Sequence, residues 1–241
     1  MGTSVRPNGM SSAAAALRYW ERRQEVSSNN LANVSTDGFK GQKVFAQMVE
    51  GALPAANAVT DFTPGPLNTT GNPLDVAIEG RGFLVVNTPN GERLSRGGSL
   101  HVDDAGTLTD SAGNALMGES GPVRISTRGN STPGEIQISR SGAVTVDKAE
   151  VGRLRLETVP DNTPLAREGS GLFIPLSKRA KMDGETNSIR QGSLEQSNVS
   201  SVSEMVDMIS IQRAYTAVQK AMTTLDGARG IATTELGRPA N

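Results

Sequence analysis

The sequence has 241 residues, of which 36% are hydrophobic, 27 are glycine and 12 are proline, and it contains no cysteine. The 24 basic and 25 acidic residues are spread without blocks and sum to a formal charge of -1, so no long-range field favours a nucleic acid or an anionic membrane as a partner. Disulfides and thiolate metal sites are excluded, and no stretch approaches the ~20 apolar residues of a membrane span, so we expect no membrane insertion.

The first predicted element is a helix over about residues 9–35. Apolar or small residues recur seven apart in two series, which is the a/d pattern of a helix that packs against another helix. The first series is Met10, Leu17, Gln24 and Leu31, and the second is Ala13, Trp20, Ser27 and Val34. The pair Asp37-Gly38 then favours a left-handed stop, so we assign 1–40 to an N-terminal helical segment.

The middle of the chain changes character. Residues 41–71 contain Pro54, Pro64 and Pro66 and are predicted to form an extended linker, because proline fixes φ and removes a donor. Short apolar runs follow, separated by turn pairs such as Asn90-Gly91 and Asp183-Gly184, at the spacing of an all-β domain. The predicted strands are 74–78, 83–86, 123–125, 135–138, 143–146 and 154–159. We therefore expect a compact β domain over 72–192.

The last segment, 193–241, is predicted to contain a long helix whose start is capped by Ser200 or Ser201 with Glu204. One apolar series consists of Met208, Ile211, Tyr215, Val218, Met222 and Leu225, and a neighbouring stripe consists of Val199, Val202, Val206 and Ile209. Two alternatives stay open from periodicity: the terminal helices pair with each other as a stalk, or they associate between subunits. The predicted fold class is α+β, with long N- and C-terminal helices forming a coiled-coil-like stalk and a mainly-β domain inserted between them.

Few residues are candidates for a catalytic, metal-binding or phosphate-binding site. His101 is the only histidine and lies beside a predicted turn, so a solvated strand histidine is favoured over a catalytic base. Asp103-Asp104 lacks the ligand spacing of a calcium loop, and Glu79-Gly80-Arg81-Gly82 precedes a strand instead of the helix that a phosphate loop needs. We therefore expect no catalytic residue, no cofactor and no metal, although a secreted β-domain binding or hydrolytic module with a helical stalk remains an alternative.

Four stretches, in order, resemble the signatures of the bacterial flagellar rod and hook proteins. The first is Asn-Asn-Leu-Ala-Asn-Val-Ser-Thr-Asp-Gly-Phe-Lys over 29–40, and the second is Asn-Pro-Leu-Asp-Val-Ala-Ile-Glu-Gly-Arg-Gly-Phe over 72–83. The third is Ser-Arg-Gly-Gly-Ser-Leu over 95–100 with 104–108, and the fourth is Gly-Ser-Leu-Glu-Gln-Ser-Asn-Val over 192–199 with 204–206 and 212–215. Four motifs in order are far more specific than any one of them.

The resemblance implies a structural role. A member of this family would pass through the flagellar type III export apparatus without a cleaved signal peptide and polymerise, with itself and other rod subunits, into the periplasmic drive shaft. The short separation between Phe39 and Asn72 is similar to that of proximal-rod subunits, and a distal-rod subunit is the alternative. We further hypothesise that both termini are poorly ordered in the free monomer and fold on assembly.

The resemblance and the two seams together predict an assembly interface. Asn29, Asn30 and Asn33 are expected to hydrogen-bond between subunits, with Leu31 and Val34 as apolar contacts. The remaining predicted interface residues are Met10, Leu17, Trp20, Val202, Met205, Met208, Ile209, Ile211, Tyr215, Val218, Met222 and Leu225.

Overall fold

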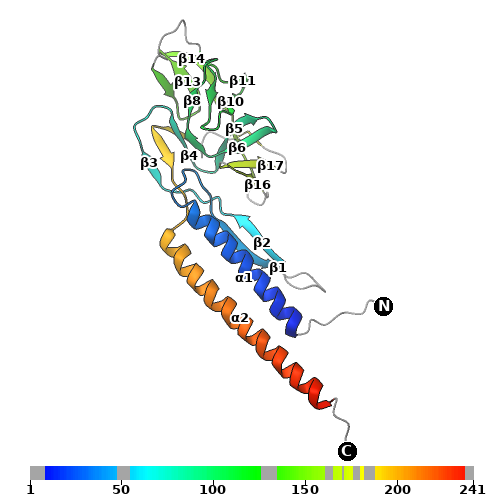
Figure 1. Ribbon diagram of the computed structural model, residues 1–241. Coiled ribbons are helices and arrows are strands. Elements are labelled where there is room, and N and C mark those ends of the chain that lie inside the picture. Colours follow the sequence, from blue (N-terminus) through cyan, green and yellow to red (C-terminus); the bar gives the residue numbers. More distant parts are fainter. Residues whose placement is uncertain are drawn as a thin grey trace, which may run out of the picture. The chain divides into compact units, whose positions relative to one another are not determined.

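The computed structural model contains two helices and a set of short strands, which fall into two compact units. The described residues are 9–47, 55–125, 135–160, 165–169, 171–175, 180–181 and 188–236. What we call the helical unit comprises the described residues within 1–33, 42–61 and 199–241, and the β unit comprises those within 34–41 and 62–198. The predicted class, α+β with a helix near each end and a mostly-β middle, is confirmed (Figure 1).

The helical unit is built on two antiparallel helices, α1 (Gly9–Ala32) and α2 (Ser201–Leu236), which lie side by side (Figure 1). Two contacts show that the helices run in opposite directions. The Tyr215 hydroxyl of α2 donates to Glu21 of α1 at 3.1 Å, and Asp207, earlier in α2, lies 3.7 Å from Arg23, which is later in α1. The partial burial of both helices therefore comes largely from each other.

Helix α1 ends earlier than predicted, whereas α2 begins at its predicted cap. α1 ends at Ala32, three residues before the predicted limit, and the Asn33 amide closes the last turn by donating to the carbonyl of Asn29 at 3.2 Å. Gly38 has the predicted left-handed conformation, with φ of 67°, but it lies beyond the helix. α2 begins after Ser200, whose hydroxyl accepts from the Ser203 amide at 3.4 Å, as expected for an N-cap.

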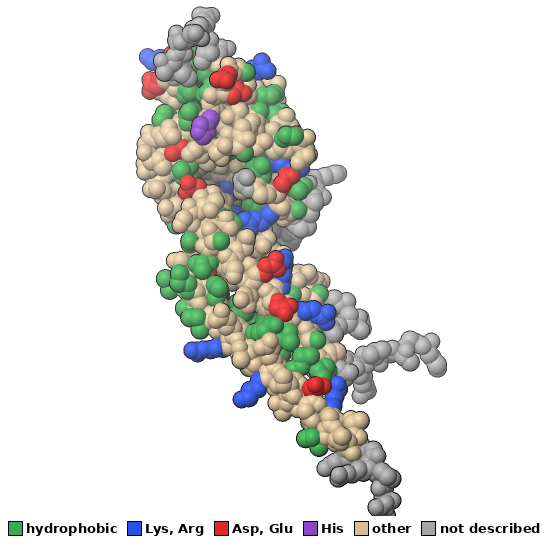
Figure 2. All heavy atoms as spheres, in the orientation of Figure 1, with side chains coloured by type: hydrophobic (Ala, Val, Ile, Leu, Met, Phe, Trp, Pro, Cys, Tyr) green, Lys and Arg blue, Asp and Glu red, His purple; other side chains and the backbone are tan. Residues whose placement is uncertain are grey.

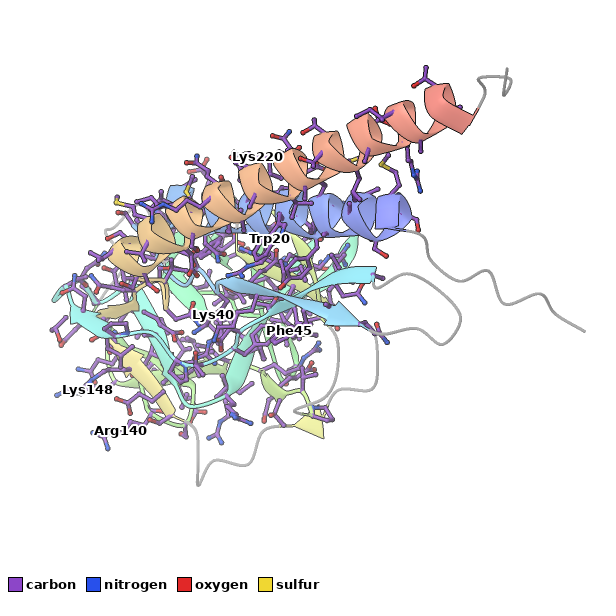
Figure 3. All side chains as sticks on the ribbon, turned by 90° about the horizontal axis from the view of Figure 1, so that it is seen from below. Trp20, Lys40, Phe45, Arg140, Lys148 and Lys220 are labelled. Atoms are coloured by element: carbon purple, nitrogen blue, oxygen red, sulfur yellow. The ribbon has the colours of Figure 1, made fainter. Side chains whose placement is uncertain are left out.

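The segment predicted as an extended linker is partly folded, which corrects that prediction. β1 (Gln42–Gln47) and β2 (Ala55–Thr60) form an antiparallel hairpin within the helical unit, with Gln42 opposite Thr60 and Gln47 opposite Ala55. The alternating burial along β2 shows why: one side of the ribbon packs on α1 and the other is exposed. Figure 3 shows α1 between α2 and this hairpin.

The β unit holds the remaining described strands in several small sheets. The largest sheet has the order β16 (Leu165–Glu168), β17 (Leu172–Pro175), β6 (Gly91–Ser95), β5 (Gly82–Thr88), β10 (Ala115–Gly118), β9 (Leu108–Thr109) and β8 (His101–Val102), joined by β15 (Leu156–Thr158), β18 (Ala180–Lys181) and β11 (Gly121–Pro122). The others are β12 (Ile136–Ile138), β13 (Ala143–Val146) and β14 (Ala149–Arg153); β19 (Ser188–Gln191), β4 (Asp75–Glu79) and β7 (Gly97–Ser99); and β20 (Ser193–Glu195) with β3 (Leu67–Thr69).

Strand β5 lies between the two apolar cores of the β unit. Leu84 and Val86 belong to the larger core, whereas Phe83 and Val85 belong to a smaller one that also contains Phe173. Successive side chains of a strand point to opposite faces, so a strand covered on both faces is apolar throughout. This explains why Phe-Leu-Val-Val is a continuous apolar run and not an alternating one.

The predicted strands are found with one exception. Residues 123–125 form only an isolated bridge, in which Arg124 pairs with Thr107, although Val123 and Ile125 are buried in the larger core. The predicted turn at Asp183-Gly184 lies outside the described residues.

Candidate assembly interface

The two sides of α2 have different environments. The predicted a/d series faces α1: Ile211 is 1% exposed, and Met208, Tyr215, Val218 and Met222 are partly buried. Leu225, the last of that series, is 44% exposed. The inward face of α2 is therefore occupied within the chain, and above all at Ile211.

The opposite side of α2 carries an exposed apolar stripe. It consists of Val202, Met205, Val206 and Ile209, which are 70%, 52%, 60% and 54% exposed. Two residues along a helix are a little more than half a turn, so Ile209 lies on the side of α2 away from Ile211. Hydrophobic side chains are visible on the surface over the first turns of α2 in Figure 2. We call these four residues the outward stripe.

A hydrogen-bonded cluster of Ser27, Asn30, Gln42 and Glu204 connects α1, α2 and the hairpin in the helical unit, and we call it the polar joint. The Ser27 hydroxyl and the Asn30 amide donate to the two carboxylate oxygens of Glu204, at 2.5 and 2.9 Å. Asn30 also donates to the Gln42 carbonyl and accepts from the Gln42 amide, both at 2.9 Å. Because Ser27 and Asn30 are buried, these bonds avoid the cost of unpaired polar groups.

This joint changes the role of the asparagines. The Asn30 side chain is 3% exposed and is engaged through both its donor and its acceptor inside the chain, so we assign it to the joint and not to a bond between subunits. Asn29 is exposed, and the Asn33 side chain donates to the Asn29 carbonyl at 2.8 Å. Glu204, which was expected to help cap α2, instead accepts the two buried donors.

The apolar residues predicted on α1 are partly covered. Met10 and Leu17 line a groove with Met222 of α2, and Trp20 is half-buried. Leu31 and Val34 are also partly buried, at the end of α1 and just after it. The structure thus brings part of the predicted α1 and α2 seams together within one chain.

The β1–β2 hairpin carries another exposed apolar surface, formed by a pair of residues that were not among the predicted interface residues. Phe45 and Val59 are 55% and 56% exposed. Phe45 pairs with Asn57 and Val59 with Lys43, so Phe45 and Val59 lie diagonally on the same face of the ribbon, away from α1 (Figure 3). The run Lys-Val-Phe-Ala-Gln over 43–47 contains the apolar residues of a strand, but it falls in the segment that was predicted to be a linker.

The β unit contains a buried ion cluster of Lys40, Arg96 and Glu195. Lys40 Nζ lies 2.7 Å from Glu195 Oε1, and Arg96 Nε lies 3.0 Å from Glu195 Oε2. Each residue belongs to a different one of the motifs that carry the family resemblance. Sequence reasoning missed these three residues, because lysine, arginine and glutamate are almost always exposed.

The described residues give little support to a catalytic or metal-binding site. His101 is exposed at the start of β8 and is visible in Figure 2. Within the described ranges, no group of three or more histidine, aspartate or glutamate residues is arranged to hold a metal ion. Nor is any helix in that part of the chain long and apolar enough to cross a membrane.

Three family models match the chain in order along the sequence. They are flagella basal body rod protein over residues 10–40, flagellar hook protein FlgE/F/G D1 domain over 77–146, and flagellar basal body rod FlgEFG protein C-terminal over 190–234. The flagellar basal-body rod protein FlgF of Escherichia coli is 34% identical, over 90% of this chain and 94% of the relative. The chain belongs to the flagellar basal-body rod protein family.

Other relatives agree with this family assignment. FlgF of Caulobacter vibrioides is 32% identical over 83% of this chain and 86% of the relative, and FlgG of Bacillus subtilis is 27% identical over 89% and 94%. The chain is a FlgF-like member of the family, whose proteins are structural components of the flagellar basal-body rod and assemble with other axial components. The three matched regions also contain, one each, Lys40, Arg96 and Glu195 of the buried ion cluster.

Proposed function

We propose that the chain is a proximal-rod subunit that binds neighbouring subunits, both copies of itself and other rod proteins, through the outward stripe of α2. The observation that carries this proposal is the exposure of Val202, Met205, Val206 and Ile209 on the side of α2 that α1 does not cover. Burying an apolar side chain of this size contributes roughly 1.5 to 3 kcal/mol, so four of them supply a substantial association energy.

The hairpin supports an open assembly over a closed pair. The unit has two unlike apolar surfaces, the outward stripe on α2 and the Phe45–Val59 pair on the ribbon, and α1 separates the two elements. A contact between unlike surfaces is heterologous and repeats without closing unless the rotation happens to close it. A helical assembly needs contacts of this kind.

The proposal includes the route and the other partners. The chain would reach the periplasmic rod through the flagellar export apparatus without a cleaved signal peptide, and its helices would form a coiled-coil-like stalk in the assembled rod. The near-neutral charge supports a protein partner over a nucleic acid. No cofactor and no catalytic step is part of this function.

A distal-rod position is the second candidate, because a FlgG relative matches along 89% of the chain. Complementation separates the two positions. A chain that restores motility to cells lacking their proximal-rod protein, and fails in cells lacking their distal-rod protein, supports the proximal position. The reverse result favours the distal one.

The interface is tested by replacing Ile209 with aspartate, with Ser210→Asp as the control, since Ser210 is also exposed on α2 but lies about 100° round the helix from Ile209. The Ile209→Asp chain should keep its monomeric helix content and lose concentration-dependent assembly, because a carboxylate would have to be buried in the contact. Sedimentation and circular dichroism measure the two properties. Assembly that is equal in both variants would remove the outward stripe from the interface.

A further inference from the structure

A groove of about 840 Å³ lies between α1 and α2 in the helical unit, nearer to the end of α2 than the outward stripe. Its lining is mainly apolar, and a volume of this size has room for several side chains. The side chains that matter below come from both helices: Met10, Leu17, Thr216, Met222, Thr223 and Asp226. We call this feature the helix groove.

The outward stripe and the helix groove cannot meet within one chain. The middle of the stripe is at Met205 and Val206, and the middle of the part of α2 that lines the groove is near residue 221. The two points are about 15 residues apart on one helix, which is ~22 Å. The stripe can therefore reach a helix groove only on a second copy of the chain.

The end of α2 extends beyond α1. Helix α1 begins at Gly9, and a Cβ on Gly9 would be 3.7 Å from Cδ1 of Leu225, so these two residues lie side by side. Residues 226–234 of α2 lie past this level and are all exposed, with Ile231 at 62%. A second copy that is displaced by about 15 residues along α2 would cover this end as well as the helix groove.

Two copies can place the stripe in the groove in two ways. They can exchange stripe and groove as a closed antiparallel pair, or each copy can bind the next in an open parallel series. Arg213 lies about half-way along α2 between the stripe and the groove, and it is one turn after Ile209, ~40° round the helix. A closed pair would therefore place the two Arg213 guanidinium groups side by side, and like charges repel.

The parallel series brings opposite charges together instead. With a displacement of about 15 residues, Arg213 of one copy is level with residue 228 of the next, ~3 Å along the axis from Asp226. Both side chains are exposed, and among the described residues neither belongs to an ion pair. Arg229 is near the same level but does not line the groove. Charge complementarity thus favours the parallel series.

The hairpin offers the stripe a less suitable surface. Val59 is paired with Lys43 across the ribbon, so a cation lies beside the exposed Phe45–Val59 pair. The nearby carboxylate of Asp61 already binds Lys43 at 2.7 Å. This surface would therefore give Arg213 a weaker partner than Asp226.

We propose that the outward stripe of one copy binds the helix groove of the next copy, with the α2 helices parallel and displaced by ~22 Å, and with Arg213 paired to Asp226 across the contact. The inference rests on the proposed function of the outward stripe as an interface, and it adds which surface the stripe binds. Because each copy is displaced along the axis, the series does not close into a ring. It presents a stripe at one end and a groove at the other.

Engineered cysteine pairs test the register, since the chain has no cysteine of its own. In the full-length chain, Ile209→Cys and Thr223→Cys place one thiol in the stripe and one in the groove, at levels that the proposed displacement brings together. Mild oxidation of the assembled protein should give a ladder of covalent oligomers. The control is Ile209→Cys with Thr216→Cys, because Thr216 also lines the groove but lies ~10 Å too early along α2 for a disulfide, and it should give at least about tenfold less product.

Charge reversal tests the pairing independently. Arg213→Asp and Asp226→Arg should each weaken assembly on the order of 10-fold, because each change brings like charges together. The double variant should regain most of the loss, because it restores opposite charges at the same place. Sedimentation measures assembly, and circular dichroism of the dilute monomer checks that each variant is folded.

Several outcomes would overturn the inference. Covalent dimers without larger oligomers would indicate the closed antiparallel pair, and a double reversal no better than the single ones would remove the Arg213–Asp226 contact. Absence of any concentration-dependent assembly would exclude a second copy as the occupant of the groove.

The Ile209→Asp variant separates this inference from the proposed function. If it assembles as well as its Ser210→Asp control, the outward stripe is not an interface and the proposed function fails. If it does not assemble, and the cysteine pair in the groove gives no ladder, the stripe remains an interface and only its partner surface is wrong.

Discussion

The two units of the chain differ in how far they bury their large apolar side chains. In the described part of the β unit, the large apolar residues gather into two cores, and strand β5 contributes to both. In the helical unit, the described apolar residues that are buried are Val26 and Ile211. Every large hydrophobic residue that is exposed in the described chain belongs to the helical unit: Phe45, Val59, Val202, Met205, Val206, Ile209, Leu225 and Ile231.

This difference indicates which unit is complete by itself. Apolar burial is the main favourable term in folding, and the β unit obtains it within one chain. The helical unit obtains less, and its joint of Ser27, Asn30 and Glu204 fixes geometry more than it adds apolar burial. The helical unit is therefore the part that we propose neighbouring rod subunits complete.

The largest expected effect contrasts two phenylalanines. Phe173 is 1% exposed and packs edge-on against Phe62 and Phe83, so Phe173→Ala should lower the free energy of unfolding of the β unit by about 3–5 kcal/mol. The same change at exposed Phe45 should alter folding by less than about 0.5 kcal/mol. Urea denaturation followed by circular dichroism measures both. Equal effects at the two sites would remove the contrast between the units.

A second contrast lies on α2 itself. Ile211→Asp places a carboxylate in the α1–α2 contact and should destabilise the helix pair in the monomer by about 2–5 kcal/mol, whereas Ile209→Asp should leave the monomer intact. Thermal loss of helix signal in dilute protein distinguishes them. Loss of assembly in Ile211→Asp would then follow from unfolding, so this substitution is a poorer test of the interface than Ile209→Asp.

The polar joint predicts a smaller effect. Asn30→Ala removes the donors to Glu204 and Gln42 and the acceptor of the Gln42 amide, and should cost the helical unit about 1–3 kcal/mol. Asn29→Ala, on the exposed side of the same turn, is the control. If Asn30→Ala affects assembly while the monomer keeps its stability, Asn30 bonds between subunits after all.

The smallest expected effect is a change in the pKa of Tyr215. The hydrogen bond from the Tyr215 hydroxyl to Glu21 raises the pKa of Tyr215 above its ordinary value, so Glu21→Gln should lower it again. Because the folded-state pKa is raised, this contribution to stability is complete below the ordinary tyrosine range and is lost as the pH rises through the raised pKa. Ultraviolet titration in a Tyr19→Phe background reads Tyr215 alone. A pKa that is unchanged by Glu21→Gln would mean that α1 and α2 do not make this contact.

The sequence predicted the elements with strong local signals and missed those set by long-range contacts. Both terminal helices were found because their apolar residues recur at helical spacing over several turns. The β1–β2 hairpin was missed because only Val44, Phe45 and Val59 mark its strands as apolar, among small and polar residues, and prolines lie nearby. Local composition favoured a linker there.

The candidate site was predicted in part for a similar reason. Periodicity identified both apolar sides of α2 but did not reveal that Ile211 faces α1 while Ile209 faces outward. The burial of Lys40, Arg96 and Glu195 depends on contacts between residues up to 155 positions apart, which no local pattern encodes. Their positions within three separate family motifs were the available signal.

The contrast between the two units is tested most directly by hydrogen exchange on the dilute monomer and on the assembled protein. We predict slow exchange in β4, β5 and β6 in both states. Amides of α1 and of the first turns of α2 should exchange faster than those strands in the monomer and gain further protection on assembly. Fully protected amides over residues 10–32 in the dilute monomer, with no further change on assembly, would contradict the account.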